Sequence, residues 1–407
     1  MPSNRLAGPV AGAATLALVA ACCAASWPDS SPLVPRRGGH PGGDPVWAWI
    51  YLGCVLAAFA TFVAGLAAVR RGGVRLRTVA VLAALIQLAP LGAPLLLSTD
   101  AWTYWGYGRI AAVHGGNPYA DPPSRFPGDA AFPHLGEDWR DSTSVYGPAF
   151  TLASEPLALA AGRSADAAAW IYKGLAAAAM LGVVALVTLL ASRRAFAAAF
   201  VGWNPLLALH FAGGGHNDVW MALLVAAALG LAATGRRRLA GAAWAASILV
   251  KWVPLLLLPL RALEARATGR RVDHIGFALA AATLGVAATV RYGWDWVTVF
   301  GPLARNATEQ TAYALPQRLD SIGLPDHTGV AVLAAGFGVA YGWLLREAAR
   351  GRARLGLATG LLLLATPWLV PWYVVWSAPL AAIEDDPAAL AVTLAVSAYL
   401  LPQALPL

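Results

Sequence analysis

Asp100 stands where a long apolar run, residues 79–97, gives way to a polar stretch that continues to Arg109. A carboxylate at the end of a hydrocarbon-spanning helix is costly to hold there unless it is hydrated or paired. In a half-buried, wet pocket it can accept a proton from an attacking hydroxyl, so we predict that Asp100 is a general base. The alternative is structural, because an aspartate near a helix start also caps backbone N–H groups.

Aromatic and basic side chains follow Asp100 in the sequence. Arg109 suits a carboxylate or phosphate partner, and it suits an anchor at a membrane interface equally well. Trp102 and Tyr104 are residue types that settle at such an interface, which favours anchoring over substrate contact. Chemistry at a membrane surface is the hypothesis that this loop suggests.

A glycine-rich turn, residues 213–215, precedes His216, Asn217 and Asp218. Glycines let the backbone approach a ligand closely, and a helix N-terminus favours an anion, so a phosphate-bearing substrate suits this corner. The alternative is that Asn217 or Asp218 is a plain helix N-cap. Because three adjacent residues rarely share one ion, we expect no metal site there.

Lys251 lies inside an otherwise apolar segment, where its charge requires a partner or a wet cavity. Neutralising a lipid phosphate is the favoured role. Pairing with a buried carboxylate and snorkelling towards an interface both remain open.

A second polar stretch, residues 292–327, combines amides, carboxylates and aromatic rings. Such groups bind sugars through hydroxyl hydrogen bonds and apolar ring contacts, but they equally suit an exposed loop. A glycosylation sequon at residues 306–308 is too short a motif to be specific. The candidate residues are Trp294, Asp295, Trp296, Arg305, Asn306, Glu309, Gln310, Tyr313, Gln317, Arg318, Asp320, Asp326 and His327.

The composition indicates that the chain is a membrane protein. The chain has 407 residues, of which 58% are hydrophobic and 12% charged, whereas soluble domains carry roughly 25% charged residues. The net charge of +8 comes from short arginine clusters between apolar runs. That pattern indicates topology and contact with anionic lipid rather than nucleic-acid binding. Three cysteines without metal or disulfide spacing add no further site.

We predict an all-α, polytopic helical bundle that forms a single domain over residues 1–407. Two regions, 239–264 and 355–383, are broken by proline, and each should enter the membrane and return, giving about thirteen membrane segments. The first run should be an uncleaved helix rather than a signal peptide. The expected spans are 8–25, 46–69, 79–97, 167–191, 195–212, 217–233, 274–291, 328–346 and 388–405.

Orientation follows from the arginine clusters, which should be cytoplasmic. The polar loops 98–146 and 292–327 then face the outer side. Residues 147–161 are too short to span comfortably, so we expect a helix lying at the outer surface. The clusters lie at residues 70–77, 193–194, 236–238, 261–271 and 346–354.

Several short motifs resemble the polyprenol-phosphate-sugar-dependent glycosyltransferases of the GT-C fold. They are ThrAspAlaTrpThrTyrTrpGlyTyrGlyArg (99–109), AsnProTyr (117–119), SerValTyrGlyPro (144–148), TrpAsnPro (203–205), GlyGlyHisAsnAsp (214–218), LeuValLysTrpValPro (249–254) and ProTrpTyrValValTrp (371–376). The chain is most similar to the actinobacterial mannosyltransferases that build lipomannan and phosphatidylinositol mannosides. The resemblance covers most of residues 79–380, preceded by two extra helices within 8–69.

This resemblance implies a multi-pass enzyme of the plasma membrane with its active site on the outer face. It implies a polyprenyl-phosphate-mannose donor, a glycolipid or lipoglycan acceptor and inversion at the anomeric carbon, with no further cofactor. Asp100 matches the base in an outer catalytic loop spanning 98–162, and Lys251 is the best-placed phosphate ligand, followed by His216 and Arg109. The substrate-contacting residues that we predict are Tyr104, Asn117, Tyr119, Tyr146, Asn204, Asn217, Asp218, Gln317, Arg318, Trp372 and Tyr373.

Linkage and acceptor stay open, because the chain is shorter than many lipomannan-elongating members of that family. The alternative function is a transporter or flippase for a lipid-linked substrate, since broken helices around a buried charge are typical of transporters. Transporters often contain matching internal repeats, and no second copy of the Asp100 loop or of the Lys251 hairpin is found in the sequence.

Overall fold

A computed structural model describes the chain in two compact units. Unit 1 contains residues 1–144, 149–220 and 404–407, and unit 2 contains residues 145–148 and 221–403. All regular elements of the described part are helices, which confirms the all-α prediction. The described residues are 4–35, 43–272, 274–299, 309–323, 325 and 327–406.

Five helices in this described part are long and apolar enough to cross a membrane. A sixth span results if α8 (Arg194–Gly202) and the next helical segment, bent by 52° relative to it, are counted as one. All lie where the sequence predicts a span, whereas the total of about thirteen segments stays a prediction. The five are α1 (Asn4–Ala24), α2 (Val46–Arg70), α7 (Ala165–Leu190), α13 (His274–Tyr292) and α16 (Thr328–Ala349).

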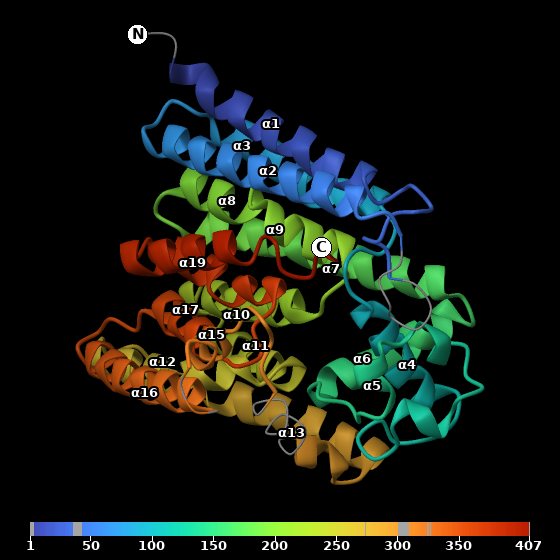
Figure 1. Ribbon diagram of the computed structural model, residues 1–407. Helices are drawn as coiled ribbons and strands as arrows, with labels where there is room; N and C mark the ends of the chain where they lie inside the picture. The colour runs from blue at the N-terminus through green and yellow to red at the C-terminus, as the bar shows by residue number, and fades with distance from the viewer. Residues whose placement is uncertain are drawn as a thin grey trace. The chain divides into compact units, whose positions relative to one another are not determined.

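In unit 1, α1 and α2 pack along each other, and α3 (Leu76–Leu88) packs against both α1 and α8 (Figure 1). The helices approach closely because small residues face one another: a Cβ on Gly202 would lie 2.4 Å from the Ala83 methyl group. Trp203 is fully buried beside this contact, and its indole N–H donates to the carbonyl of Val79 over 3.0 Å. The first residue of the TrpAsnPro motif therefore belongs to the core of unit 1.

The span predicted over residues 79–97 ends early. Regular helix stops at Leu88, a short 3-10 turn, η1 (Ala89–Gly92), follows, and the chain then runs to Asp100 without regular structure. Two prolines, Pro90 and Pro94, explain the change because proline has no N–H for the helix ladder. The prediction from this apolar run, which contains both prolines, therefore made the helix about two turns too long.

The chain after this break forms α4 (Asp100–Ala112), then irregular structure, and then α6 (Pro148–Ala161). A helix after the TyrGlyPro motif is thereby confirmed, whereas its place at a membrane surface stays a prediction. Between Gly108 of α4 and α6 there is no room for a side chain, since a Cβ would lie 2.4 Å from the carbonyl oxygen of Ser154. Short helical turns in the intervening loop are η2 (Pro123–Arg125), η3 (Phe132–His134) and α5 (Glu137–Arg140).

Unit 2 contains the first predicted break. Helix α11 (Arg237–Val250) ends at Lys251, and η5 (Val253–Leu256) and α12 (Leu257–Ala267) follow, which confirms the expected interruption near Lys251 and Pro254. In the same unit α11 packs against α13 and α12 packs against α16 (Figure 1).

The second predicted break is also present. Helix α17 (Leu355–Ala365) ends before Pro367, and after irregular residues the chain forms η7 (Pro371–Trp376), α18 (Ala378–Glu384) and α19 (Pro387–Tyr399). Helix α17 packs against both α18 and α19. The remaining elements are α9 (Pro205–Ala208), η4 (Leu209–Gly213), α10 (Asp218–Ala233), η6 (Asp295–Val299) and α15 (Leu315–Asp320).

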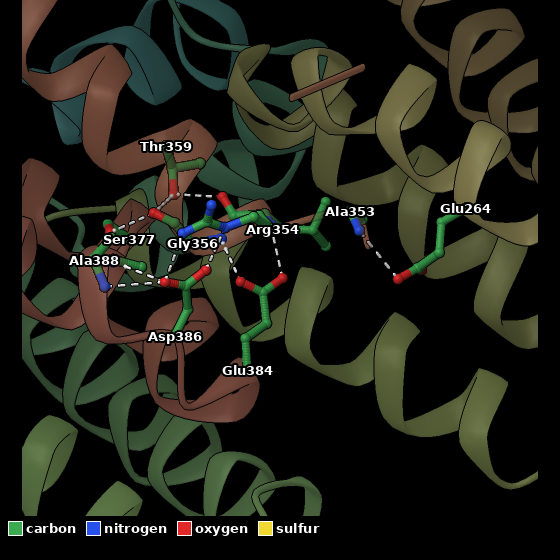
Figure 2. Close-up of polar contacts among 11 residues, drawn as sticks. Glu264, Ala353, Arg354, Gly356, Thr359, Ser377, Glu384, Asp386 and Ala388 are labelled. Carbon is green, nitrogen blue, oxygen red and sulfur yellow. Dashed lines mark hydrogen bonds and ion pairs between the residues drawn. The ribbon is translucent and has the colours of Figure 1, made fainter. Parts of the chain in front are cut away.

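An acidic cluster, Glu384 with Asp386, joins the starts of α17 and α19 (Figure 2). Asp386 accepts from Arg354 Nε at 2.6 Å and Nη2 at 2.9 Å, and its Oδ1 also caps α19 through the N–H of Ala388. Glu384 accepts the backbone N–H groups of Leu355 at 2.6 Å and Gly356 at 3.0 Å. The carboxylates satisfy helix-start N–H groups that have no partner within their own helices.

Candidate active site

Asp100 is the first residue of α4 in unit 1, and the segment before it is tied down at several points. The N–H of Leu96 donates to Gly213 over 3.0 Å, and that of Leu97 donates to Leu33 over 2.9 Å. Leu97 has a φ of 61°, a left-handed conformation that costs a branched side chain free energy and persists only where the surroundings enforce it. The carboxylate of Asp100 is therefore presented by a constrained backbone.

The Asp100 carboxylate meets an imidazole and a phenol. Its Oδ2 lies 3.1 Å from Nδ1 of His216 and accepts from the hydroxyl of Tyr104 over 3.3 Å. The same hydroxyl lies 3.4 Å from both Oδ1 and the backbone N of Asn217. The Asp100 side chain is 13% exposed and that of His216 is fully buried, so the pair is accessible only from the aspartate side. We call Asp100, His216, Tyr104 and Asn217 the Asp100 cluster.

The glycine-rich turn positions His216 by leaving room for its ring. A Cβ on Gly214 would lie 2.8 Å from Nε2 of His216 and 2.7 Å from the carbonyl oxygen of His210. Gly215 has a φ of 75°, which glycine adopts without steric cost. The preceding turn, η4, is a π-helix, a rare element that occurs often at functional sites. The glycines thus make room for the imidazole. The sequence analysis predicted a different role for them, the close approach of a ligand to the backbone.

The chemistry available to this cluster is proton transfer. An ionised Asp100 accepts hydrogen bonds from the phenol and from Nδ1–H of a neutral imidazole, and both contacts stabilise one carboxylate orientation. The amide nitrogen of Asn217 is buried and has no hydrogen-bond partner among the described residues, so it is a candidate donor to a ligand.

Several predicted ligand residues near this cluster have structural partners. Asn204 is 1% exposed and caps α9 by accepting the N–H of Leu206 over 3.0 Å. Asp218 is fully buried at the start of α10. Tyr104 and Trp102 are 1% and 7% exposed, so the interpretation of both as interfacial anchors was wrong. Their rings are packed inside unit 1 because α4 is covered by protein on most of its sides.

Arg109 forms the carboxylate pairing that the sequence left open. Its Nε donates to Asp129 over 2.8 Å, its Nη1 donates to the carbonyl of Gly162, and the guanidinium lies over the ring of Trp105. Burial by itself raises the pKa of Asp129, but hydrogen bonds and charge from Arg109, with a further bond from His114, hold that pKa below its ordinary value. This ion pair stabilises the fold of the loop after α4.

Asn117 and Tyr119 also shape that loop. The side-chain oxygen of Asn117 accepts the N–H of Tyr119 over 3.1 Å, the local turn typical of asparagine. The hydroxyl of Tyr119 donates to Thr151 of α6 over 2.8 Å. The AsnProTyr motif therefore connects the loop to α6.

Lys251 belongs to unit 2, where it is half-buried at the end of α11 with an extended backbone. Its ammonium nitrogen lies 4.8 Å from the ring centre of Tyr373 and 5.7 Å from that of Trp376. The two rings stack on each other with centres 3.9 Å apart. Two distant motifs, LeuValLysTrpValPro and ProTrpTyrValValTrp, are thus brought together around one cation. Aromatic faces attract ammonium ions, so these two rings hold the ammonium group of Lys251 near them.

The TyrGlyPro motif packs against the same break. The N–H of Gly147 donates to the carbonyl of Val250 over 3.1 Å, and a Cβ at this position would lie 2.1 Å from the carbonyl oxygen of Leu249. Tyr146, also in unit 2, is 7% exposed. Glycine is required here because two backbones are in direct contact.

The remaining predicted residues of unit 2 are more peripheral. Arg318, on α15, is exposed and donates to the hydroxyl of Tyr399 over 3.3 Å, while Gln317 and Trp372 are half-buried. Arg305, Asn306 and Asp326 lie outside the described residues, as does the sequon.

The sequence analysis missed Lys173, which is 1% exposed in α7. Its ammonium donates to the carbonyls of Leu91, Ala93 and Pro94, the residues at which the α3 run stops being helical. An ammonium group has three N–H donors, and three carbonyls use them. Lys173 therefore stabilises the segment that leads to Asp100. The signal was present, since a charge inside an apolar run is costly.

The apolar helices and the buried Asp100 cluster define a helical protein of the membrane-embedded class, with a polar centre capable of proton transfer. The chain belongs to a mannosyltransferase family: a family model described as "Alpha-(1->6)-mannopyranosyltransferase, N-terminal domain" matches residues 6–267. This match confirms the family resemblance. It covers Asp100, His216 and Lys251, whereas Trp372 and Tyr373 lie beyond it.

Individual relatives agree with the family match. The chain is 25% identical to alpha-(1->6)-mannopyranosyltransferase A of Mycobacterium tuberculosis, with 74% of this chain and 65% of that protein covered. It is 30% identical to alpha-(1->6)-mannopyranosyltransferase B of Corynebacterium glutamicum, with 78% and 61% covered. A probable alpha-(1->6)-mannopyranosyltransferase of Mycolicibacterium smegmatis is 27% identical, with 75% and 66% covered. The chain thus spans a little under two thirds of these relatives' length. No solved structure matches it.

Proposed function

We propose that the chain is an inverting α-mannosyltransferase of the plasma membrane that uses polyprenyl-phosphate mannose as donor. The acceptor is a glycolipid or lipoglycan at the outer face, and the names of the relatives favour an α-(1→6) linkage. The single observation that carries the proposal is the Asp100 cluster, inside the region that the family model matches.

In the proposed reaction Asp100 removes the proton of the acceptor hydroxyl as its oxygen attacks the anomeric carbon. A new C–O bond forms on the face opposite the lipid phosphate. The bond between the anomeric carbon and the phosphate oxygen breaks, and its electron pair leaves with the polyprenyl phosphate. A positioned base contributes about 10²–10⁴-fold to such a step.

His216 and Lys251 have separate roles in this proposal. The Nδ1 contact at 3.1 Å supports His216 as the group that orients Asp100, in place of the phosphate-binding role that the sequence suggested. Lys251 supplies positive charge to the departing phosphate, and its contacts with Tyr373 and Trp376 restrict where the ammonium lies. Arg109 is assigned to the loop because its guanidinium is bound to Asp129.

The test is a transfer assay. Membranes from an expressing strain receive radiolabelled polyprenyl-phosphate mannose, with and without candidate glycolipid acceptors. We expect labelled product that depends on acceptor and that survives a chelator, because a monophosphate leaving group facing Lys251 needs little additional neutralisation. Label that crosses the membrane without forming a new glycoside would instead identify a flippase. Activity abolished by chelator and restored by Mg²⁺ or Mn²⁺ would contradict the metal-free mechanism.

Lys251 has its own test within this assay. Replacing it with methionine keeps the apolar stem and removes the charge, and we expect kcat to fall about 10²–10³-fold, the effect typical of losing one preorganised stabilising group. Lys251→Arg is the matched control, because it keeps a cation over Tyr373 and Trp376. Equal loss in both variants would point to packing rather than charge as the cause.

A further inference from the structure

A cavity of about 260 Å³ lies within unit 1, beside the segment that leads to Asp100. Ala93, Pro94 and Leu95 form one wall, and Trp102, in the first turn of α4, forms part of another. Further lining residues are Asp166, Trp170 and Lys173 in the first turns of α7, and His134 in the loop between α4 and α6. None of these residues belongs to the Asp100 cluster, so the cavity is a separate feature of the same unit.

The two tryptophans offer apolar faces of different kinds. Trp102 is 7% exposed, and its indole N–H donates to the carbonyl of Ala165 over 2.9 Å, which fixes the orientation of the ring. Trp170 is 54% exposed at the cavity, and the ammonium of Lys173 lies 5.0 Å from the centre of its ring. Rigid aromatic faces of this kind contact the C–H faces of a sugar ring with little loss of conformational entropy.

The charges in the wall select for a neutral ligand. Asp166 disfavours an anion, and Lys173 disfavours a cation, so neither a phosphate nor a quaternary ammonium group suits both. The three N–H donors of Lys173 are already used by carbonyls, whereas Asp166 is exposed and can accept hydrogen bonds from hydroxyls. An acyl chain would have to desolvate the exposed carboxylate of Asp166, which is costly. A polyhydroxylated, uncharged ring fits all of these constraints.

We propose that this cavity is a saccharide-binding subsite that holds a sugar unit of the acceptor one position removed from the reacting hydroxyl. The inference rests on the proposed function, because the reacting unit itself is assigned to Asp100. Asp100 and Trp102 are two residues apart on α4 and therefore point to different sides of the helix. A disaccharide that continues past the first turn of α4 would thus contact the cavity, whereas a monosaccharide at Asp100 would leave it empty.

The experiment uses the full chain in detergent, with octyl α-mannoside and octyl α-(1→6)-dimannoside as probes. Trp170→Ala should weaken equilibrium binding of the dimannoside about tenfold, equivalent to about 1.4 kcal/mol. The ratio of kcat/KM for the dimannoside to that for the monomannoside should fall by a similar factor. Trp170→Phe keeps an aromatic face and should restore most of both. Trp49→Ala is the matched control, because Trp49 is 60% exposed in the same unit but on α2, away from the cavity.

The two readouts separate the subsite from the reaction. If no variant and no wild-type protein transfers mannose, the proposed function fails, and the binding measurement still decides on the cavity. If transfer occurs but Trp170→Ala binds the dimannoside as the wild type does, the subsite is wrong and the proposed function stands. Equal weakening in Trp49→Ala would also overturn the subsite.

Discussion

The Asp100 cluster of unit 1 and the Glu384–Asp386 cluster of unit 2 both hold carboxylates at helix starts, but the partners of these carboxylates differ. Asp386 is held by Nε and Nη2 of Arg354 and by backbone N–H groups (Figure 2). Burial by itself raises the pKa of Asp386, but the hydrogen bonds and the charge of Arg354 outweigh it and keep that pKa below its ordinary value. Asp100 contacts a histidine and a tyrosine instead.

The difference separates an acid that stabilises the fold from one to which we assign the role of general base. A carboxylate with a guanidinium partner has its negative charge compensated, and it neither needs nor easily accepts a proton. Asp100 is instead held by a phenol and an imidazole, which fix its orientation, and its side chain remains 13% exposed. The partners of an acid therefore indicate its role better than its place at a helix start.

Asp100→Asn should give the largest effect among the variants that test this comparison, a loss of turnover. Because the amide cannot accept the acceptor's proton, we expect turnover to fall about 10²–10⁴-fold with little change in thermal stability. The measurement is product formation per folded protein, with unfolding followed in the same detergent. Asp386→Asn should instead lower the thermal stability and leave turnover per folded protein nearly unchanged. Normal turnover in Asp100→Asn would refute the base assignment.

Arg354→Ala should affect stability rather than turnover. It leaves the Asp386 carboxylate, 4% exposed, without its cation, and breaking a buried pair costs about 3 kcal/mol. Unfolding midpoints compare it with Arg350→Ala, whose side chain is 73% exposed beside Glu347 and should change stability by no more than about 0.5 kcal/mol. Equal midpoints for the two variants would show that the cluster adds no stability.

His216→Ala tests whether the imidazole acts on Asp100 or on the donor. Loss of a hydrogen bond to a charged group costs about 1.5–3 kcal/mol, so kcat should fall about tenfold to a hundredfold. The donor KM should stay the same. A raised donor KM with unchanged kcat would restore the phosphate-binding role.

Glu384→Gln gives the smallest effect, visible in pH dependence. Burial raises the pKa of Glu384 from its ordinary 4.5 to about 7, and two backbone N–H bonds oppose this only in part. Since the folded state binds the proton more tightly, the group's contribution to stability is complete below about pH 4.5 and is lost as pH rises through about 7. Wild-type melting midpoints should therefore decline more steeply over this window than those of Glu384→Gln. Parallel profiles would contradict an elevated pKa.

Much of the fold could be predicted because it depends on local chemistry. Apolar length located the long helices, and proline located both breaks, at Lys251–Pro254 and after α17. The end of α3 was misjudged because the run remains apolar past Pro90, so hydropathy and helix continuity disagree there. The number of membrane segments depends on bent and short helices, for which length alone is a poor criterion.

The candidate site was only partly predictable for a different reason. Asp100 and Lys251 stand out because isolated charges beside apolar runs are costly. The pairing of Arg109 with Asp129 depends on how the loop after α4 folds, and no periodicity indicates it. Lys173, like Lys251, is a charge inside an apolar run and could have been noticed for that reason. Its partners are backbone carbonyls, which no sequence pattern reveals.

Gly214 has a consequence for how genetic data on this protein would be interpreted. An added methyl group there would collide with Nε2 of His216 at 2.8 Å and would tilt the imidazole away from its aspartate. A screen for inactive alleles should therefore recover alanine at this position as often as changes in the reacting groups themselves. A residue without a side chain would then be mistaken for a catalyst, although its contribution is the empty volume above its α-carbon.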